Sequence, residues 1–164
     1  MRKYLICILP PIIIILVNIF FVSIANVVGV SMMPNLYDGD LLIYQKFSKN
    51  FERFDIIVVE YNNVNYIKRI IGLPGEKIEY KDNILYINNE KIEETFLNDS
   101  VVTEDFTLLD ITEEIEYLPK NTYLVLGDNR QNSIDSRIFS YISIENILGE
   151  VKFKIFPFNR FGKI

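Results

Sequence analysis

Three polar clusters in this chain have residue types and spacings that could support catalysis. The first contains Ser31 just before Pro34. The second contains Lys68 among isoleucines. The third is the polar run 127–137. The chain has no histidine, so a proton acceptor working near neutral pH must be another residue type, with its pKa shifted by its surroundings.

The missing histidine excludes whole classes of site. A Ser-His-Asp or Cys-His hydrolase cannot be built from this chain, nor can a zinc site or a haem with histidine ligands. The single cysteine cannot form an intrachain disulfide or supply a cysteine-rich metal site. We therefore expect neither a metal nor another cofactor.

Lys68 lies in a run whose alternation predicts a strand, on the face shared with Tyr66 and Ile70. A lysine on a mostly apolar face loses hydration, which lowers its pKa from about 10.4 towards the range of a working base. Taken alone, Lys68 is equally typical of a lysine that extends from a sheet edge into water.

The other two clusters also have ordinary interpretations when taken singly. Ser31 could be a loop serine, and the run 127–137 could be a surface loop in which Asp135 pairs with Arg137. Together they supply a nucleophilic Ser31, a base in Lys68 and a second hydroxyl, Ser133, that could orient the lysine. These are the parts of a Ser-Lys dyad, in which neutral lysine accepts the serine proton.

The three clusters resemble the conserved boxes of bacterial type I signal peptidases, in the family order and over nearly the whole chain. The matching residues are Ser31-Met32-Met33-Pro34-Asn35-Leu36 with Gly39-Asp40, Lys68-Arg69-Ile70-Ile71-Gly72-Leu73-Pro74-Gly75-Glu76, and Gly127-Asp128-Asn129 with Ser133 and Asp135-Ser136-Arg137. Asn35, Glu76 and Ser140 replace the family's usual Thr, Asp and Gly. Gly29 lacks the hydroxyl that some Gram-negative members use for the oxyanion, as in many Gram-positive members.

The resemblance implies a role for each matching residue. Ser31 is the expected nucleophile and main oxyanion donor, Lys68 the base, Ser133 the residue that orients Lys68, and Met32 part of the substrate pocket. The expected supporting residues are Asp128, Asn129, Asp135 and Arg137. The implied reaction is removal of signal peptides from secreted preproteins after small residues at −1 and −3.

The N-terminal region predicts a membrane anchor. Residues 4–25 carry no charge, and as a helix they would span roughly 33 Å, about the hydrocarbon thickness of a bilayer. Arg2 and Lys3 should keep the N-terminus cytoplasmic. We therefore expect a tip and anchor over residues 1–26 and an extracytoplasmic catalytic domain over 27–164. Two other interpretations are a cleavable signal ending at Ala25, with Ser23 at −3, and a buried helix of a soluble protein.

The remainder predicts a mainly β domain: the signal-peptidase and repressor-protease-like fold of twisted antiparallel sheets, preceded by one transmembrane helix. Runs rich in β-branched and aromatic residues indicate strands, with turns at Asn62-Asn63 and Asn88-Asn89. The expected strands are residues 27–31, 41–45, 54–60, 65–71, 77–80, 84–87, 91–92, 122–126 and 147–156. A helical turn is expected near 143–146.

Charge bears on the expected partners. Without Arg2 and Lys3, the formal net charge of −5 becomes −7 for the rest of the chain, which argues against nucleic acid. Secreted preproteins and membrane lipid are the expected partners, and Phe153, Phe156 and Phe158 are candidates for lipid contact or for the core. Two rival functions are a non-catalytic membrane-anchored assembly or pilus accessory protein of the same fold, and a self-cleaving Ser-Lys protease.

Overall fold

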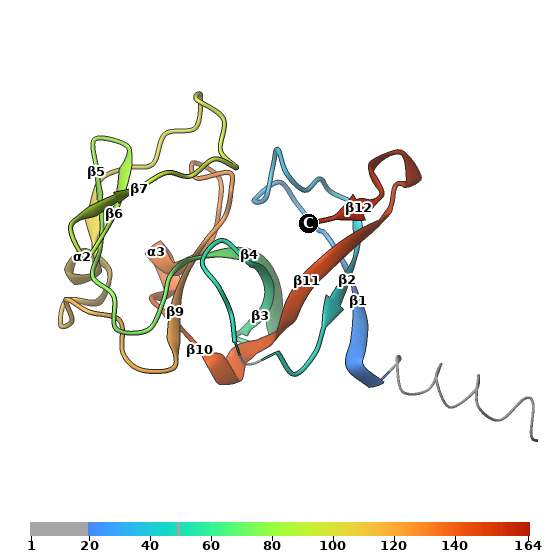
Figure 1. The fold of residues 1–164 in the computed structure, drawn as a ribbon, viewed down its shortest axis with the longest axis horizontal. Helices are drawn as coiled ribbons and strands as arrows, with labels where there is room; N and C mark the ends of the chain where they lie inside the picture. Colours follow the sequence, from blue (N-terminus) through green and yellow to red (C-terminus); the bar gives the residue numbers. More distant parts are fainter. Residues whose placement is uncertain (1–19, 49) are drawn as a thin grey trace, which may run out of the picture.

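The computed structural model describes residues 20–48 and 50–164, which form two antiparallel β-sheets (Figure 1). The larger sheet has the order β1-β2-β11-β3-β4-β9-β10, and β12 pairs with β11. Its strands are β1 (Val22–Asn26), β2 (Leu41–Gln45), β3 (Ile56–Tyr61), β4 (Val64–Gly72), β9 (Thr122–Leu126), β10 (Ile142–Ser143), β11 (Ile147–Phe156) and β12 (Gly162–Lys163).

The smaller sheet has the order β7-β6-β5-β8 and lies on the opposite side of β9 from β1 and β2 in Figure 1. Its strands are β5 (Ile78–Lys81), β6 (Ile84–Ile87), β7 (Glu90–Ile92) and β8 (Phe106–Thr107). The described helical segments are short: α2 (Leu108–Thr112), α3 (Ser136–Phe139), η1 (Ile144–Asn146) and η2 (Phe158–Arg160).

Asparagine-rich turns set the hairpins. Asn62-Asn63 joins β3 to β4, Asp82-Asn83 joins β5 to β6, and Asn88-Asn89 joins β6 to β7, all with positive φ. Asn and Asp tolerate this left-handed conformation, whose twist matches that of the flanking strands. The predicted turns are confirmed.

The core has three apolar clusters, one of which holds the segment containing Ser31. This cluster includes Met32 and Leu36 with Leu42 of β2 and Val58 of β3. Both Met32 and Leu36 are almost fully buried. Apolar packing therefore fixes the loop on either side of Pro34 against the larger sheet.

The structure corrects the sequence prediction near the N-terminus. The expected strand over 27–31 is wrong, because these residues form a loop in which Gly29 has φ +86°. The strand is instead β1, paired in register from Val22↔Gln45 to Asn26↔Leu41. The predicted membrane helix therefore cannot continue to Ala25, and the described β domain includes residues 22–26.

The predicted anchor otherwise falls on residues 1–19, which lie outside the described residues. Among residues 20–48 and 50–164, no helix has the length and apolar character needed to cross a bilayer.

The other predicted strands are confirmed, with the same bounds for β2, β6, β9 and β11 and with bounds within two residues for the rest. The predicted turn near 143–146 is η1. The sequence analysis missed β8, β10 and β12, each of two residues, and the short helices α2 and α3.

Candidate active site

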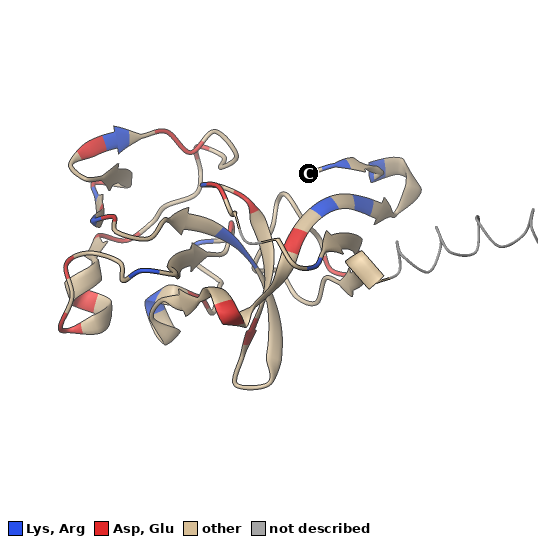
Figure 2. Ribbon diagram, turned by 60° about the horizontal axis from the view of Figure 1, so that its bottom comes forward, with Lys and Arg blue, Asp and Glu red and all other residues tan. Residues whose placement is uncertain are grey.

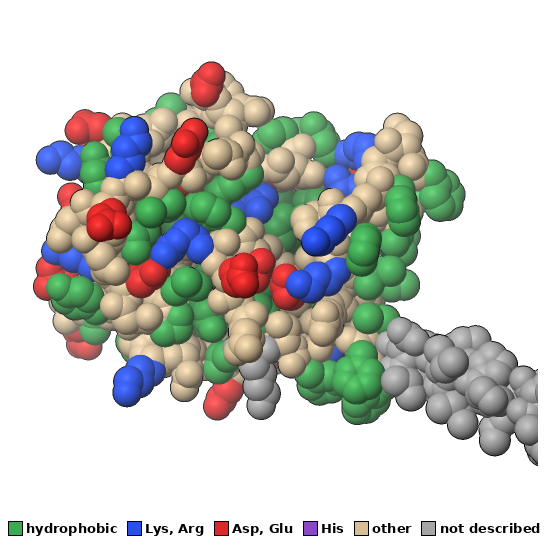
Figure 3. Space-filling view, in the orientation of Figure 1, with side chains coloured by type: hydrophobic (Ala, Val, Ile, Leu, Met, Phe, Trp, Pro, Cys, Tyr) green, Lys and Arg blue, Asp and Glu red, His purple; other side chains and the backbone are tan. Residues whose placement is uncertain are grey.

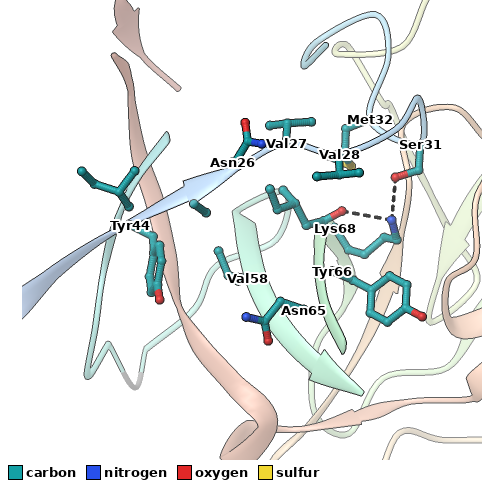
Figure 4. A pocket seen from close by; sticks show the side chains of 13 residues that line it. Asn26, Val27, Val28, Ser31, Met32, Tyr44, Val58, Asn65, Tyr66 and Lys68 are labelled. Atoms are coloured by element: carbon teal, nitrogen blue, oxygen red, sulfur yellow. Dashed lines mark hydrogen bonds between the residues drawn. The ribbon is translucent and has the colours of Figure 1, made fainter. Parts of the chain in front are cut away.

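Ser31 and Lys68 are brought into direct contact. Lys68 Nζ donates a hydrogen bond to Ser31 Oγ over 2.7 Å and another to the Ile67 carbonyl oxygen over 3.1 Å (Figure 4). Ser31 comes from the loop between β1 and β2, whereas Lys68 comes from β4. When the lysine is neutral, the same short contact allows its nitrogen to accept the serine proton.

The backbone around Ser31 is held by the third polar cluster. Asn129 N donates to the Ser31 carbonyl oxygen over 2.9 Å, and Asn129 Nδ2 donates to the Val30 carbonyl oxygen over 3.1 Å. Gly127 allows this close approach, because a Cβ there would lie only 2.5 Å from the Ser31 carbonyl oxygen. Asn129 therefore shapes the site through the backbone of Ser31.

Lys68 is buried, with only 2% of its surface exposed. Burial lowers the pKa of Lys68 from 10.5 to about 8, against the opposing effect of Asp135 and Asp128, while Arg137 adds to the decrease. Roughly one Lys68 in ten is then neutral at pH 7, far more than for an exposed lysine. The expectation that burial lowers the pKa of Lys68 is confirmed.

Asp128 forms a buried bidentate ion pair with Arg69, the residue after Lys68. Arg69 Nε and Nη2 donate to the two Asp128 oxygens over 2.8 and 2.7 Å. Asn35 Nδ2 also donates to Asp128, over 2.8 Å, and to the Phe96 carbonyl oxygen, over 3.0 Å. Asp128 thus connects β4, the Ser31 loop and the segment after β9.

The predicted pair between Asp135 and Arg137 is present. Arg137 Nε and Nη2 donate to Asp135 over 2.9 and 2.8 Å, and Gly127 N donates to the same carboxylate over 3.0 Å. Asp135 is fully buried, so the pair fixes the return of the chain from β9 towards α3.

The predicted hydrogen bond between Ser133 and Lys68 is absent. Ser133 Oγ is buried and has no hydrogen-bond partner among the described residues, while Lys68 donates to Ser31 and Ile67 instead. Ser133 lies against Gly127, where a Cβ would come within 2.2 Å of its Oγ. The structure therefore places Ser133 beside the Ser31 backbone without joining it to Lys68.

A cavity of about 260 Å³ adjoins the Ser31–Lys68 pair, and Met32 lines it as expected (Figure 4). Its wall is formed by both polar and apolar groups. Its lining comes from β1 and the following loop, from β4, and from single residues of β2 and β3: Ile24, Ala25, Asn26, Val27, Val28, Ser31, Met32, Tyr44, Val58, Asn65, Tyr66, Ile67 and Lys68.

Two strand edges border this cavity. Among the described residues, β1 ends the larger sheet, and residues 64–68 of β4 pair with β3 only, since β9 joins β4 from Arg69 onward. Unpaired edges can accept an extended peptide by main-chain hydrogen bonding. The sequence analysis missed β1 as part of this site because its residues lay inside the predicted membrane helix.

Comparison with known proteins identifies the family. A sequence model described as "Signal peptidase, peptidase S26" matches residues 1–156. Signal peptidase I of Bacillus caldolyticus is 43% identical over 156 residues, covering 88% of this chain and 85% of its own. Signal peptidase IB of Staphylococcus aureus is 37% identical over 164 residues, covering 92% and 86%.

The crystal structure of a signal peptidase I from Enterococcus faecalis V583 also matches. It aligns with a TM-score of 0.57 and 37% identity, covering 62% of this chain and 97% of that one. These relatives are Gram-positive, as the resemblance implies. Together with the family match over residues 1–156, they show that this chain belongs to the S26 signal peptidases, the bacterial type I enzymes.

Proposed function

We propose that this chain is a membrane-anchored serine endopeptidase that removes signal peptides from secreted preproteins after small residues at −1 and −3. One observation carries the proposal: Lys68 Nζ lies 2.7 Å from Ser31 Oγ, next to a cavity, in a chain without histidine. The family assignment supports the same function.

In the proposed mechanism, neutral Lys68 accepts the proton of Ser31 as Oγ attacks the scissile carbonyl carbon. The Ser31 N–H donates to the developing oxyanion, a contact typically worth about 3 kcal/mol in such sites. The Lys68 ammonium then protonates the leaving amine as the C–N bond breaks. Water, deprotonated by Lys68, finally hydrolyses the ester and restores Ser31.

The dimensions of the cavity support a preference for small side chains. Several substrate residues would share a volume of about 260 Å³, in which Val28, Met32 and Ile67 are apolar lining residues. A peptide held in extended form between the free edges of β1 and β4 would present alternate side chains to that wall. In such a peptide every second side chain would face the cavity, which matches the spacing between the −1 and −3 positions.

For Ser133 we propose a role later in the reaction. Once Ser31 Oγ is esterified, the Lys68 ammonium needs another acceptor for its hydrogen bond. The Ser133 hydroxyl is buried without a hydrogen-bond partner in the described part of the chain and lies, with the Ser31 carbonyl oxygen, against Gly127. A side-chain rotation would let it serve Lys68 as that acceptor.

The proposed location is the cell membrane, with the N-terminus cytoplasmic and the catalytic domain outside. The anchor would precede β1, and β1 lines the cavity, so the site would stay close to the bilayer. Tethering would raise the effective concentration of membrane-bound substrates.

Exposed aromatic residues at the same end of the molecule support lipid contact. Phe153, Phe156 and Phe158 are exposed, Phe158 by 82%, which disfavours the alternative that they are core residues. Hydrophobic side chains gather over the loop between β11 and β12 and near the start of β1 (Figure 3).

Cleavage of a synthetic peptide with an Ala-x-Ala site by the detergent-solubilised full chain tests the function. We expect Ser31→Ala and Lys68→Ala each to lower kcat/KM by about a thousandfold or more without unfolding the domain, because each removes one half of the dyad. Lys91→Ala, at an exposed position in β7, is the control and should cleave normally.

Each alternative gives a different result. Near-normal cleavage by Lys68→Ala would refute the dyad. No cleavage by the wild-type chain in any detergent or at any pH would favour the accessory protein. Cleavage of its own chain but not of the peptide would favour the self-cleaving protease.

A further inference from the structure

Asp40 is a fully buried carboxylate whose two oxygens are held by cations from the last part of the described chain. Arg160 Nη2 donates to Oδ1 over 2.8 Å, and Lys154 Nζ lies 3.2 Å from Oδ2. The Tyr37 backbone N–H donates to Oδ2 over 3.0 Å. Figure 2 shows basic residues along β11 and the following segment, which supply these cations.

The same two cations contact the Ser31 loop at further points. Lys154 Nζ donates to the Asn35 carbonyl oxygen over 3.0 Å, and the Arg160 guanidinium lies 4.5 Å from the centre of the Tyr37 ring. Lys154 thus contacts a carboxylate and a backbone carbonyl, and Arg160 contacts a carboxylate and an aromatic ring. These contacts fix both side chains against the segment 35–40.

Backbone hydrogen bonds close this loop at its base. Val27 N donates to the Asp40 carbonyl oxygen over 2.9 Å, and Gly39 N donates to the Val27 carbonyl oxygen over 2.9 Å. Residues 27–40 therefore form a closed loop. Asn129 holds it beside Ser31, and the side chain of Asp40 holds it at its base.

We propose that Asp40, Lys154 and Arg160 are positioning residues that hold Ser31 Oγ in line with Lys68 and the substrate. This inference rests on the proposed function. A buried carboxylate is strongly bound to its counter-ions because leaving it unpaired is costly, so the loop has one stable placement. A displacement of about 1 Å at a nucleophile can cost about a hundredfold in rate, so such a restraint matters to catalysis.

Arg160→Met and Lys154→Met test the proposal in the full chain. Lys152→Met is the matched control, because Lys152 lies on the same strand, β11, and its ion pair is with Glu150. For each protein we would measure kcat and KM for the Ala-x-Ala peptide, the folded fraction, and amide hydrogen exchange over residues 27–40.

We expect Arg160→Met and Lys154→Met each to lower kcat per folded molecule by about tenfold or more, with KM changed by less than about twofold. Exchange over residues 27–40 should become faster in both variants but not in Lys152→Met. Arg160→Lys, which keeps a cation, should recover part of the lost kcat.

Two outcomes would overturn the proposal: exchange over residues 27–40 equal to that of Lys152→Met, or a loss of cleavage that only follows the folded fraction. Amide hydrogen exchange does not depend on cleavage, so it tests the positioning role even if the wild-type chain cleaves no peptide. Failure of the proposed function is thereby distinguished from failure of the positioning role.

Discussion

The burial of Lys68 decides when Ser31 can be activated, and this gives a prediction at the scale of one residue. The pKa of Lys68 is lowered to about 8, chiefly by burial, and only the neutral amine can accept the serine proton. We expect kcat/KM to rise with pH and to level off above about pH 8. A profile over about pH 6–10 measures this, and an optimum confined to acidic pH would contradict it.

The buried hydroxyl of Ser133 gives a second residue-scale prediction, in which stability and activity change in opposite directions. Ser133→Ala removes a buried hydroxyl that has no hydrogen-bond partner within residues 20–48 and 50–164, so the free energy of unfolding should rise by about 1 kcal/mol. It also removes the proposed acceptor for the Lys68 ammonium, so kcat should fall about tenfold.

Thermal unfolding and peptide cleavage measure the two effects of Ser133→Ala. Ser100→Ala, at an exposed position, is the control and should change neither quantity. Unchanged kcat in Ser133→Ala would show that Ser133 does not act on Lys68.

At the scale of elements, the pair between Arg69 and Asp128 joins β4 to the segment after β9. Asp128→Asn leaves the Arg69 guanidinium, which is only 8% exposed, without its counter-charge. We expect the free energy of unfolding to fall by about 3 kcal/mol in a urea titration.

The control for this element-scale prediction is Glu116→Gln, which removes the exposed partner of Lys77. It should cost less than about 1 kcal/mol, because surface pairs are screened by water. Equal costs for Asp128→Asn and Glu116→Gln would mean that the buried pair does not hold the two elements together.

The elements also show what sequence can and cannot predict. Runs rich in β-branched and aromatic residues predicted β2, β4 and β9, and the Asn-Asn turns predicted the ends of β3 and β6, because those signals are local. β1 was missed because an uncharged apolar run is typical of both a membrane helix and a buried strand. Ser31 and Lys68 were predicted because their boxes are contiguous in sequence.

The contacts of Asp40 with Arg160 could not be predicted in the same way. Asp40 and Arg160 are 120 residues apart, and no spacing or periodicity indicates that they meet. The hydrogen bond between Asn35 and Asp128 could not be predicted for the same reason, since the two residues are 93 positions apart. The pairing of Asp40 with Lys154 and Arg160 follows from the sheet order, which brings β11 next to β2.

At the scale of the whole molecule, the exposed aromatic end gives a prediction about the bilayer. The chain has no tryptophan, so Phe158→Trp introduces a single fluorescent probe at an exposed position. With the full chain in vesicles, we expect brominated lipids to quench this tryptophan strongly, because its side chain should lie among the acyl chains.

Tyr117→Trp is the control for the bilayer prediction. Tyr117 is also exposed, but it lies between α2 and β9, beside the smaller sheet, and should be quenched weakly. Equal quenching at the two positions would contradict a lipid contact at the end formed by β11 and β12.

The distance along the chain between the Ser31 loop and Arg160 has a consequence for biosynthesis. A ribosome completes Ser31 and Lys68 long before it adds Lys154 and Arg160. A chain released early would therefore carry the nucleophile and the base without the cations that hold the loop containing Ser31. Under the proposed role of Asp40, incomplete chains are poor proteases, and full activity begins only when β11 and η2 have been made and folded.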